Sequence, residues 1–291
     1  MMYFRANCSR PAGAPPARFR AAWVALLALA VVSPANHSDA DTPTDPDPDS
    51  TDITATVSIP QPGQQDVLPA VNEPFRAGEY LRFSVNWAGI SAGSAYLEVP
   101  QASDWNGNPT FTLRARAESN SYIPFYKVKN RIESVWDKRG RFSWRYSEDR
   151  REGKHTYRSQ IDFDHERHVA LYHNGQTYPI PPRVQDALSS FYYTRYQALP
   201  IGGSVLFDYH ASRKSQPLEV RVLGRDRVTT PAGVFNCVVI EPVLKAGGIF
   251  KNNGRLVIWL TDDEHRMPVM MKSKVAIGSI SVVLQEVRTG A

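Results

Sequence analysis

Apolar and polar residues alternate along most of the chain from residue 74 onward. Leu81, Phe83, Val85 and Trp87 are each separated by one more polar residue. A period of two places successive side chains on opposite faces of a strand, so this pattern predicts a half-buried β-strand. Similar runs recur at short spacing and predict further strands at 94–99, 110–119, 131–137, 142–147, 158–163, 169–173, 205–210, 218–223, 234–240, 256–260, 269–277 and 279–287.

One segment departs from this period. Val184, Leu188 and Phe191 recur at i, i+4 and i+7 after Pro181 and Pro182, which predicts a short amphipathic helix with proline in its first turn. A dozen strands with a single helix indicate an all-β fold, either a strongly curved antiparallel sheet or an incomplete β-barrel, with the helix covering its opening. Strands alternating with several helices would indicate an α/β fold, and that pattern is absent.

The first 35 residues have the pattern of an export signal. A leader without acidic residues precedes the apolar stretch 21–32, and Ser33-Pro34-Ala35 follows as a small-residue cleavage site; its basic residues are Arg5, Arg10, Arg18 and Arg20. We therefore predict a signal peptide at 1–35, a periplasmic mature protein and no transmembrane span after cleavage. The alternative is an uncleaved anchor, although the apolar stretch is shorter than the ~20 residues that span a bilayer.

Charge separates the rest of the chain into two parts. Residues 36–73 contain seven aspartates and several prolines but no Lys or Arg, which predicts a disordered acidic linker. Residues 74–291 contain 30 basic and 21 acidic residues and are predicted to form a single β-rich domain. Because acids and bases are interleaved, as in RYSEDRREGKH, we interpret them as solvated strand faces and expect no nucleic-acid partner.

Two motifs could support nucleophilic chemistry. Gly89-Ile90-Ser91-Ala92-Gly93 matches the G-x-S-x-G nucleophile elbow, but the elbow needs a following helix and residues 94–99 alternate as a strand. A glycine turn is favoured, and an esterase centred on Ser91 is a minor alternative. Cys237 lies in an apolar run without a nearby basic residue, so we expect a buried structural thiol.

Histidines and carboxylates also gather at two places. His155, His165, His168 and His173 lie close in sequence, but their spacing lacks the tight pairs of zinc sites, so exposed turn positions are favoured and no metal is expected. If a metal did bind, His155, His168 and His173 would be the first candidates. The run 262–265 (DDEH) is interpreted as a polar turn between strands.

Large aromatic residues are frequent on the predicted strands. They either fill a core or line an apolar cavity that would accept a lipid or acyl chain, as in large barrels. The candidate ligand-binding residues on these strands and on the helix are Phe83, Trp87, Trp136, Trp144, Leu188, Phe191, Phe207 and Trp259.

Several motifs together resemble a known family, the exported bacterial domain of unknown function 3108 (DUF3108). They are GEYLRF at 78–83, WAGISAG at 87–93, DALSSFYYTR at 186–195, TPAGVF at 230–235, WLTDD at 259–263 followed by Pro268, and GSI at 278–280. The resemblance covers about residues 75–287. It implies a periplasmic or surface-facing β-domain without established activity or catalytic residues. It also implies a fold similar to the Lol-type lipoprotein carriers, in which an incomplete barrel wraps an acyl-chain cavity.

These observations favour a non-enzymatic, cofactor-free periplasmic protein that binds or carries a hydrophobic envelope ligand, a lipid or an acyl chain. The alternative is a structural or protein-interaction module of the cell envelope, with a fully packed core and an envelope protein as its partner.

Overall fold

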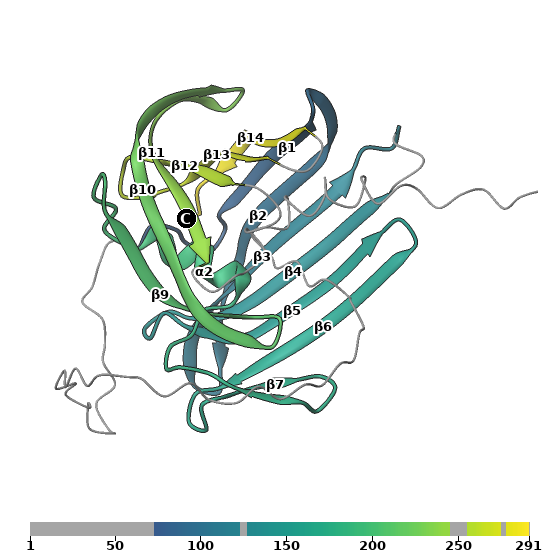
Figure 1. Ribbon diagram of the computed structural model, residues 1–291, viewed down its shortest axis with the longest axis vertical. Helices are drawn as coiled ribbons and strands as arrows, with labels where there is room; N and C mark the ends of the chain where they lie inside the picture. The colour runs from purple at the N-terminus through teal and green to yellow at the C-terminus, as the bar shows by residue number, and fades with distance from the viewer. Residues whose placement is uncertain (1–72, 123–126, 245–254, 275–277, 291) are drawn as a thin grey trace, which may run out of the picture.

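The computed structural model describes residues 73–122, 127–244, 255–274 and 278–290 (Figure 1). The expected signal peptide and nearly all of the expected linker lie outside these residues. The described chain forms one 14-stranded sheet in which every neighbouring pair is antiparallel. Its strands are β1 (Tyr80–Trp87), β2 (Ile90–Trp105), β3 (Asn108–Ser119), β4 (Val128–Asp137), β5 (Ser143–Glu152), β6 (His155–Asp164), β7 (Val169–Tyr172), β8 (Thr177–Pro179), β9 (Ser204–Ala211), β10 (Lys214–Thr230), β11 (Gly233–Leu244), β12 (Leu256–Thr261), β13 (Pro268–Lys274) and β14 (Ser279–Arg288).

The two ends of the strand series meet in the middle of the sheet. The order runs from β8 back to β1, and β1 then pairs with β14, which leads through β13, β12, β11 and β10 to β9. The sheet curls around its one described helix but stays open, with β8 and β9 as its edges (Figure 1). This arrangement confirms the predicted curved antiparallel sheet.

The period-2 pattern defines the inner face of the sheet. In β1 the side chains of Leu81, Phe83 and Val85 are at most 2% exposed, whereas the residues between them are only half-buried. The buried set joins one large apolar cluster that extends over almost the whole sheet and the helix. Burying one face of each strand therefore fixes which side is the inside.

The open edge of β9 pairs with Gln185, just before the described helix. The amide of Gln185 donates to the carbonyl of Asp208 over 3.0 Å, and the amide of His210 donates to the carbonyl of Gln185 over 2.8 Å. This short parallel bridge satisfies backbone groups that an edge strand would otherwise expose.

Helix α2 (Ala187–Arg195) begins later than the sequence predicts. Asp186 is its N-cap, accepting from the amides of Leu188 (2.7 Å) and Ser189 (2.8 Å), while Ser189 Oγ accepts from the Asp186 amide (2.9 Å). The prediction that Val184 and the prolines belong to the helix was wrong, because this capping box fixes the start more firmly than apolar spacing does.

The position of α2 also corrects its predicted role as a cover over the opening. Eight of its nine residues are buried, including Ser189, Ser190 and Thr194, and the helix contacts β3, β4 and β9 from within the curled sheet (Figure 1). The serine and threonine hydroxyls bond backbone carbonyls of the preceding turn, as Thr194 Oγ1 does to Ser190 O over 2.8 Å. Polar side chains that are satisfied in this way can be buried at low cost. Within the described part of the chain, no helix is both long and apolar enough to cross a bilayer.

The core is most densely packed around α2. Trp136 and Tyr192 are completely buried, and Phe75 packs against Tyr192 with ring centroids 4.8 Å apart. At the end of α2, Arg195 forms a buried two-pronged ion pair with Glu79. Side chains therefore fill the interior around α2.

A second, smaller apolar cluster lies on the opposite face of β11 and its neighbours. It contains Cys237, Val228, Val269 and Met270. Cys237 is fully buried, as predicted, and burial raises the pKa of its thiol to about 11.

Candidate ligand-binding site

A row of polar side chains lies on the inner face of β4, β5 and β6. Tyr146, Glu148 and Arg150 alternate along β5, and Tyr146 belongs to the main core, so all three side chains share the inner face. In the sheet register, Arg150 lies beside Asn130 of β4 and Tyr157 of β6. We call Tyr146, Glu148, Arg150 and Asn130 the inner polar cluster.

The carboxylate of Glu148 is the centre of this cluster. Tyr146 donates its hydroxyl to Oε2 of Glu148 over 3.3 Å, and Nε of Arg150 lies 3.2 Å from the same oxygen. Burial raises the pKa of Glu148 to about 7, although the Arg150 charge and the Tyr146 hydrogen bond act to lower it. Burial, together with the nearby Glu148 charge, also raises the pKa of the Tyr146 hydroxyl well above its usual value. Glu148 therefore changes charge near neutral pH.

Arg150 has hydrogen-bonding capacity to spare. Its side chain is about nine-tenths buried, and in the described structure its Nε has no aligned hydrogen-bond acceptor. Its guanidinium lies over the ring of Tyr157, 4.8 Å from the centroid. Arg150 is therefore held in place by stacking on Tyr157 and by the charge of Glu148, while its buried Nε–H lacks an aligned acceptor.

The inner face next to this cluster is apolar. Across the register from Asn130 lie Ala117 of β3 and Ala95 of β2, and Ala115 lies beside Ile132. Ala95 and Ala115 stay partly exposed, although they share their face with the buried Leu97 and Leu113. At the level of Arg150 these small side chains are only half-buried, whereas the side chains of α2 are almost all buried.

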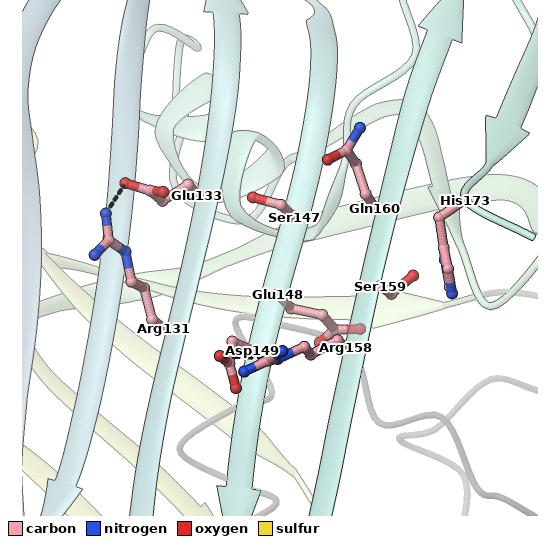
Figure 2. A pocket seen from close by; sticks show the side chains of 9 residues that line it. All are labelled: Arg131, Glu133, Ser147, Glu148, Asp149, Arg158, Ser159, Gln160 and His173. Atoms are coloured by element: carbon pink, nitrogen blue, oxygen red, sulfur yellow. Dashed lines mark hydrogen bonds and ion pairs between the residues drawn. The ribbon is translucent and has the colours of Figure 1, made fainter.

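A groove of about 370 Å³ lies over the same strands (Figure 2). Most of its lining residues belong to the outer face, because Arg131, Glu133, Asp149 and Arg158 alternate with buried residues. Their charges are already paired, with Arg131 2.8 Å from Glu133 and Arg158 3.2 Å from Asp149. We therefore regard this groove as a solvated outer face and place the candidate site on the inner face.

A second hollow, of about 280 Å³, lies where residues 73–79, the turn 263–267 and residues 287–290 meet. The DDEH run forms the predicted polar turn there. Asp263 Oδ1 accepts from the amides of His265 (3.0 Å) and Arg266 (3.2 Å), and Asp262 pairs with Arg225 and Arg266. These carboxylates are used to hold the turn.

The predicted ligand-binding residues divide between the inner core and other sites. Phe83, Trp136, Leu188 and Phe191 are buried in the main cluster, and Trp87 and Phe207 pack against it; these six share one interior. The other two tryptophans lie apart from them. Trp144 stacks with Phe142 and donates to Asp137 over 3.0 Å, and Trp259 packs against the smaller cluster and donates to Asp226 over 2.9 Å.

The inner polar cluster is absent from the residues predicted to bind ligand. Glu148 and Arg150 belong to the RYSEDRREGKH run, whose charges were all interpreted as solvated, and this interpretation was wrong for these two residues. The signal for them is their alternation with Tyr146 along β5. Residues of the run that point the other way, such as Asp149 and Arg151, do form a surface pair.

The histidines also fall in different environments. His155, His168 and His173 are exposed, whereas His165 is half-buried, contacts the Ser143 carbonyl over 2.8 Å and stacks on Phe142. His165 does lie in the predicted turn, but its half-buried ring corrects the expectation that it is exposed, and burial lowers its pKa. Among the described residues, no group of three or more His, Cys, Asp or Glu side chains is placed to hold a metal ion.

His210, which the sequence did not single out, is fully buried where the two sheet edges approach. Its Nε2 lies 3.0 Å from the Tyr172 hydroxyl and its Nδ1 lies 2.8 Å from Ser215 Oγ. Ser215 Oγ in turn donates to the Pro179 carbonyl over 3.1 Å. A neutral ring that accepts from Tyr172 and donates to Ser215 satisfies this whole chain, which joins β7 and β8 to β9 and β10. Burial lowers the pKa of His210 to about 4.

The G-x-S-x-G segment is a strand turn, as favoured from the sequence. Gly89 has a φ of 84° in the turn between β1 and β2, and Ser91 is already part of β2. A Cβ on Gly93 would overlap the carbonyl oxygen of Glu118 on β3, so this glycine is needed for close strand contact.

Comparisons with known proteins give a matching family model and solved structures of low sequence identity. The model of one protein family, described as a protein of unknown function (DUF3108), matches residues 82–285. No curated protein matches the chain. Among solved structures, a β-barrel-like protein of domain of unknown function DUF1849 from Brucella abortus is similar to it, with 12% identity and a TM-score of 0.52, over 73% of this chain and 98% of the other. A Bacteroides fragilis protein with a YmcC-like fold has 10% identity and a TM-score of 0.34, over 74% and 98% of the two chains.

Proposed function

Because the chain belongs to the DUF3108 family, whose description gives no function, we propose a function from its inner face: the protein binds or carries a hydrophobic molecule of the cell envelope, a lipid or an acyl chain. The leader at 1–35 supports export, so we place this activity in the periplasm. The protein would act by sequestering its ligand, without a cofactor and without catalysis.

One observation carries the proposal. Ala95 and Ala115 lie on the apolar inner face and remain partly exposed, next to a buried cluster in which Nε of Arg150 lacks an aligned acceptor. Ligand sites combine mostly apolar walls with a few placed polar groups and ionisable residues of shifted pKa. The inner face around Ala95, Ala115 and Arg150 has this composition, whereas the inner face beside α2 is filled by buried side chains.

The test is a fluorescence titration of the full chain, purified after export and stripped of lipid, with cis-parinarate. This polyene fatty acid becomes fluorescent in an apolar site. We expect saturable, stoichiometric binding. Ala115→Phe fills the inner face and should weaken binding about tenfold or more, a loss of about 1.4 kcal/mol.

The matched control is Thr112→Phe, on the same strand but on the outer face, which should bind as the parent does. If the parent protein does not enhance the fluorescence, the proposal is wrong, and the interaction-module alternative gains support. Equal binding by Ala115→Phe would also contradict the inner face as the site.

A further inference from the structure

The inner face is divided into an apolar side and a polar side. Along one row of the register, Ala95 and Ala117 are followed by Asn130, Arg150 and Tyr157. Along the next row, Leu97 and Ala115 are followed by Ile132, Glu148 and Ser159. A ligand lying across β3 to β5 would therefore contact methyl groups at one end and a guanidinium at the other.

The polar side contains one buried donor without an aligned acceptor, Nε of Arg150. Asn130 donates to Glu152 over 2.9 Å and accepts from the Arg151 amide over 3.1 Å, so its main bonds are made. Arg150, by contrast, stacks over Tyr157 and has the Glu148 contact at 3.2 Å, which lacks hydrogen-bond alignment at Nε. A buried guanidinium with unfilled donors costs free energy that an added acceptor can recover.

The geometry points to Arg150 as the recognition residue for the anionic headgroup, a carboxylate or a phosphate, of an acyl-chain amphiphile bound along the inner face. This inference rests on the proposed function and specifies its ligand. A guanidinium matches either anion with two parallel N–H···O bonds, which neither a neutral lipid nor an alkane could form.

The recognition of a ligand anion by Arg150 depends on the charge of the neighbouring Glu148. When Glu148 is ionised it competes with a ligand anion for Arg150, and when it is protonated this competing charge is lost, although Glu152 remains nearby. Tyr146 donates to the same Glu148 oxygen and so helps to fix the position of the carboxyl group along β5. A ligand anion would therefore replace the Glu148 carboxylate as the partner of Arg150.

The decisive experiment compares two probes with the same acyl chain, the anion cis-parinarate and its neutral methyl ester, on the full chain and on Arg150→Gln. We expect the parent to bind the acid about tenfold more tightly than the ester, and Arg150→Gln to lose this preference while still binding the ester. Arg151→Gln is the matched control, since Arg151 is the next residue on β5 and points to the outer face. It should keep the preference of the parent.

The outcomes separate the two proposals. If neither probe binds the parent, the proposed function itself is wrong. If both probes bind the parent equally, or if Arg150→Gln keeps the preference for the acid, binding stands and the headgroup inference is wrong.

A competition series on the unmodified protein gives the same answer without any variant. Laurate and dodecyl phosphate should displace the ester probe, and dodecanol should be about tenfold weaker. Equal displacement by dodecanol would overturn the inference. The stronger of the two anions identifies the headgroup as a carboxylate or a phosphate.

Discussion

Glu79 and Arg195, 116 residues apart in the chain, form a two-pronged ion pair inside the protein, with N–O distances of 2.7 and 2.8 Å. Arg195 also donates to the backbone carbonyls of Pro74 (2.9 Å) and His265 (3.1 Å). One side chain at the end of α2 thus joins the start of the domain, the helix and the turn between β12 and β13.

Breaking this pair should be costly. Arg195→Met leaves Glu79 buried without a counter-charge, and we expect a loss of about 3–5 kcal/mol in the free energy of unfolding. The comparison is Arg225→Met, which breaks the exposed pair with Asp262 and should cost about 1 kcal/mol or less. Urea denaturation measures both, and similar losses for the two variants would contradict a buried-pair role.

The buried His210 should make stability dependent on pH. Its pKa falls from 6.5 in the unfolded chain to about 4 in the folded protein, so its contribution is complete above about pH 6.5 and is lost as pH falls toward 4. The shift corresponds to about 3 kcal/mol. Thermal melts from pH 4 to pH 7 should show a shallower slope for His210→Gln than for the parent. His173→Gln removes an exposed histidine and should leave the slope unchanged.

Substitutions in the G-x-S-x-G segment test whether its residues are needed for the fold. Gly93→Ala forces a methyl group against the Glu118 carbonyl and should destabilise the fold by about 1–3 kcal/mol. Ser91→Ala, two residues away, should change stability by less than about 0.5 kcal/mol. If Gly93→Ala and the parent are equally stable in chemical denaturation, glycine at position 93 is not required for the contact between β2 and β3.

Glu148 should control the affinity for an anionic ligand. The groups facing it are Arg150 and Tyr146, with Glu152 and Tyr209 nearby. Because its pKa is about 7, lowering the pH from about 8 to about 6 protonates it and frees Arg150, which should tighten cis-parinarate binding about five- to tenfold.

The control variants for this pH effect lie on opposite faces of the sheet. Glu148→Gln should abolish the pH dependence, and Glu133→Gln, on the outer face, should retain it. An unchanged pH dependence in Glu148→Gln would assign it to another group.

The local alternation of apolar and polar residues predicted the strands well. It predicted the start of the helix and the burial of charged side chains less well. The alternation at Leu81, Phe83 and Val85 is a local signal, because burial of one face is expressed every second residue. The start of α2 depends on the side chain of Asp186, which bonds amides two and three residues later. Apolar spacing alone could not show that cap.

The candidate site depended on register across strands. Arg150 and Arg151 are both arginines in one charged run, yet one is buried and the other exposed. Counting every second residue along β5 from the buried Tyr146 assigns Arg150 to the inner face and Arg151 to the outer face. The pairing of Glu79 with Arg195, and of β1 with β14, joins residues that no local pattern connects.

Native mass spectrometry of the full chain, exported in a bacterial host and purified without organic solvent, tests the central claim most directly. The account predicts a retained mass of lipid size that organic solvent removes and that Ala115→Phe fails to retain. A bare polypeptide mass for the parent, together with no binding of cis-parinarate, would contradict the proposed ligand-binding function.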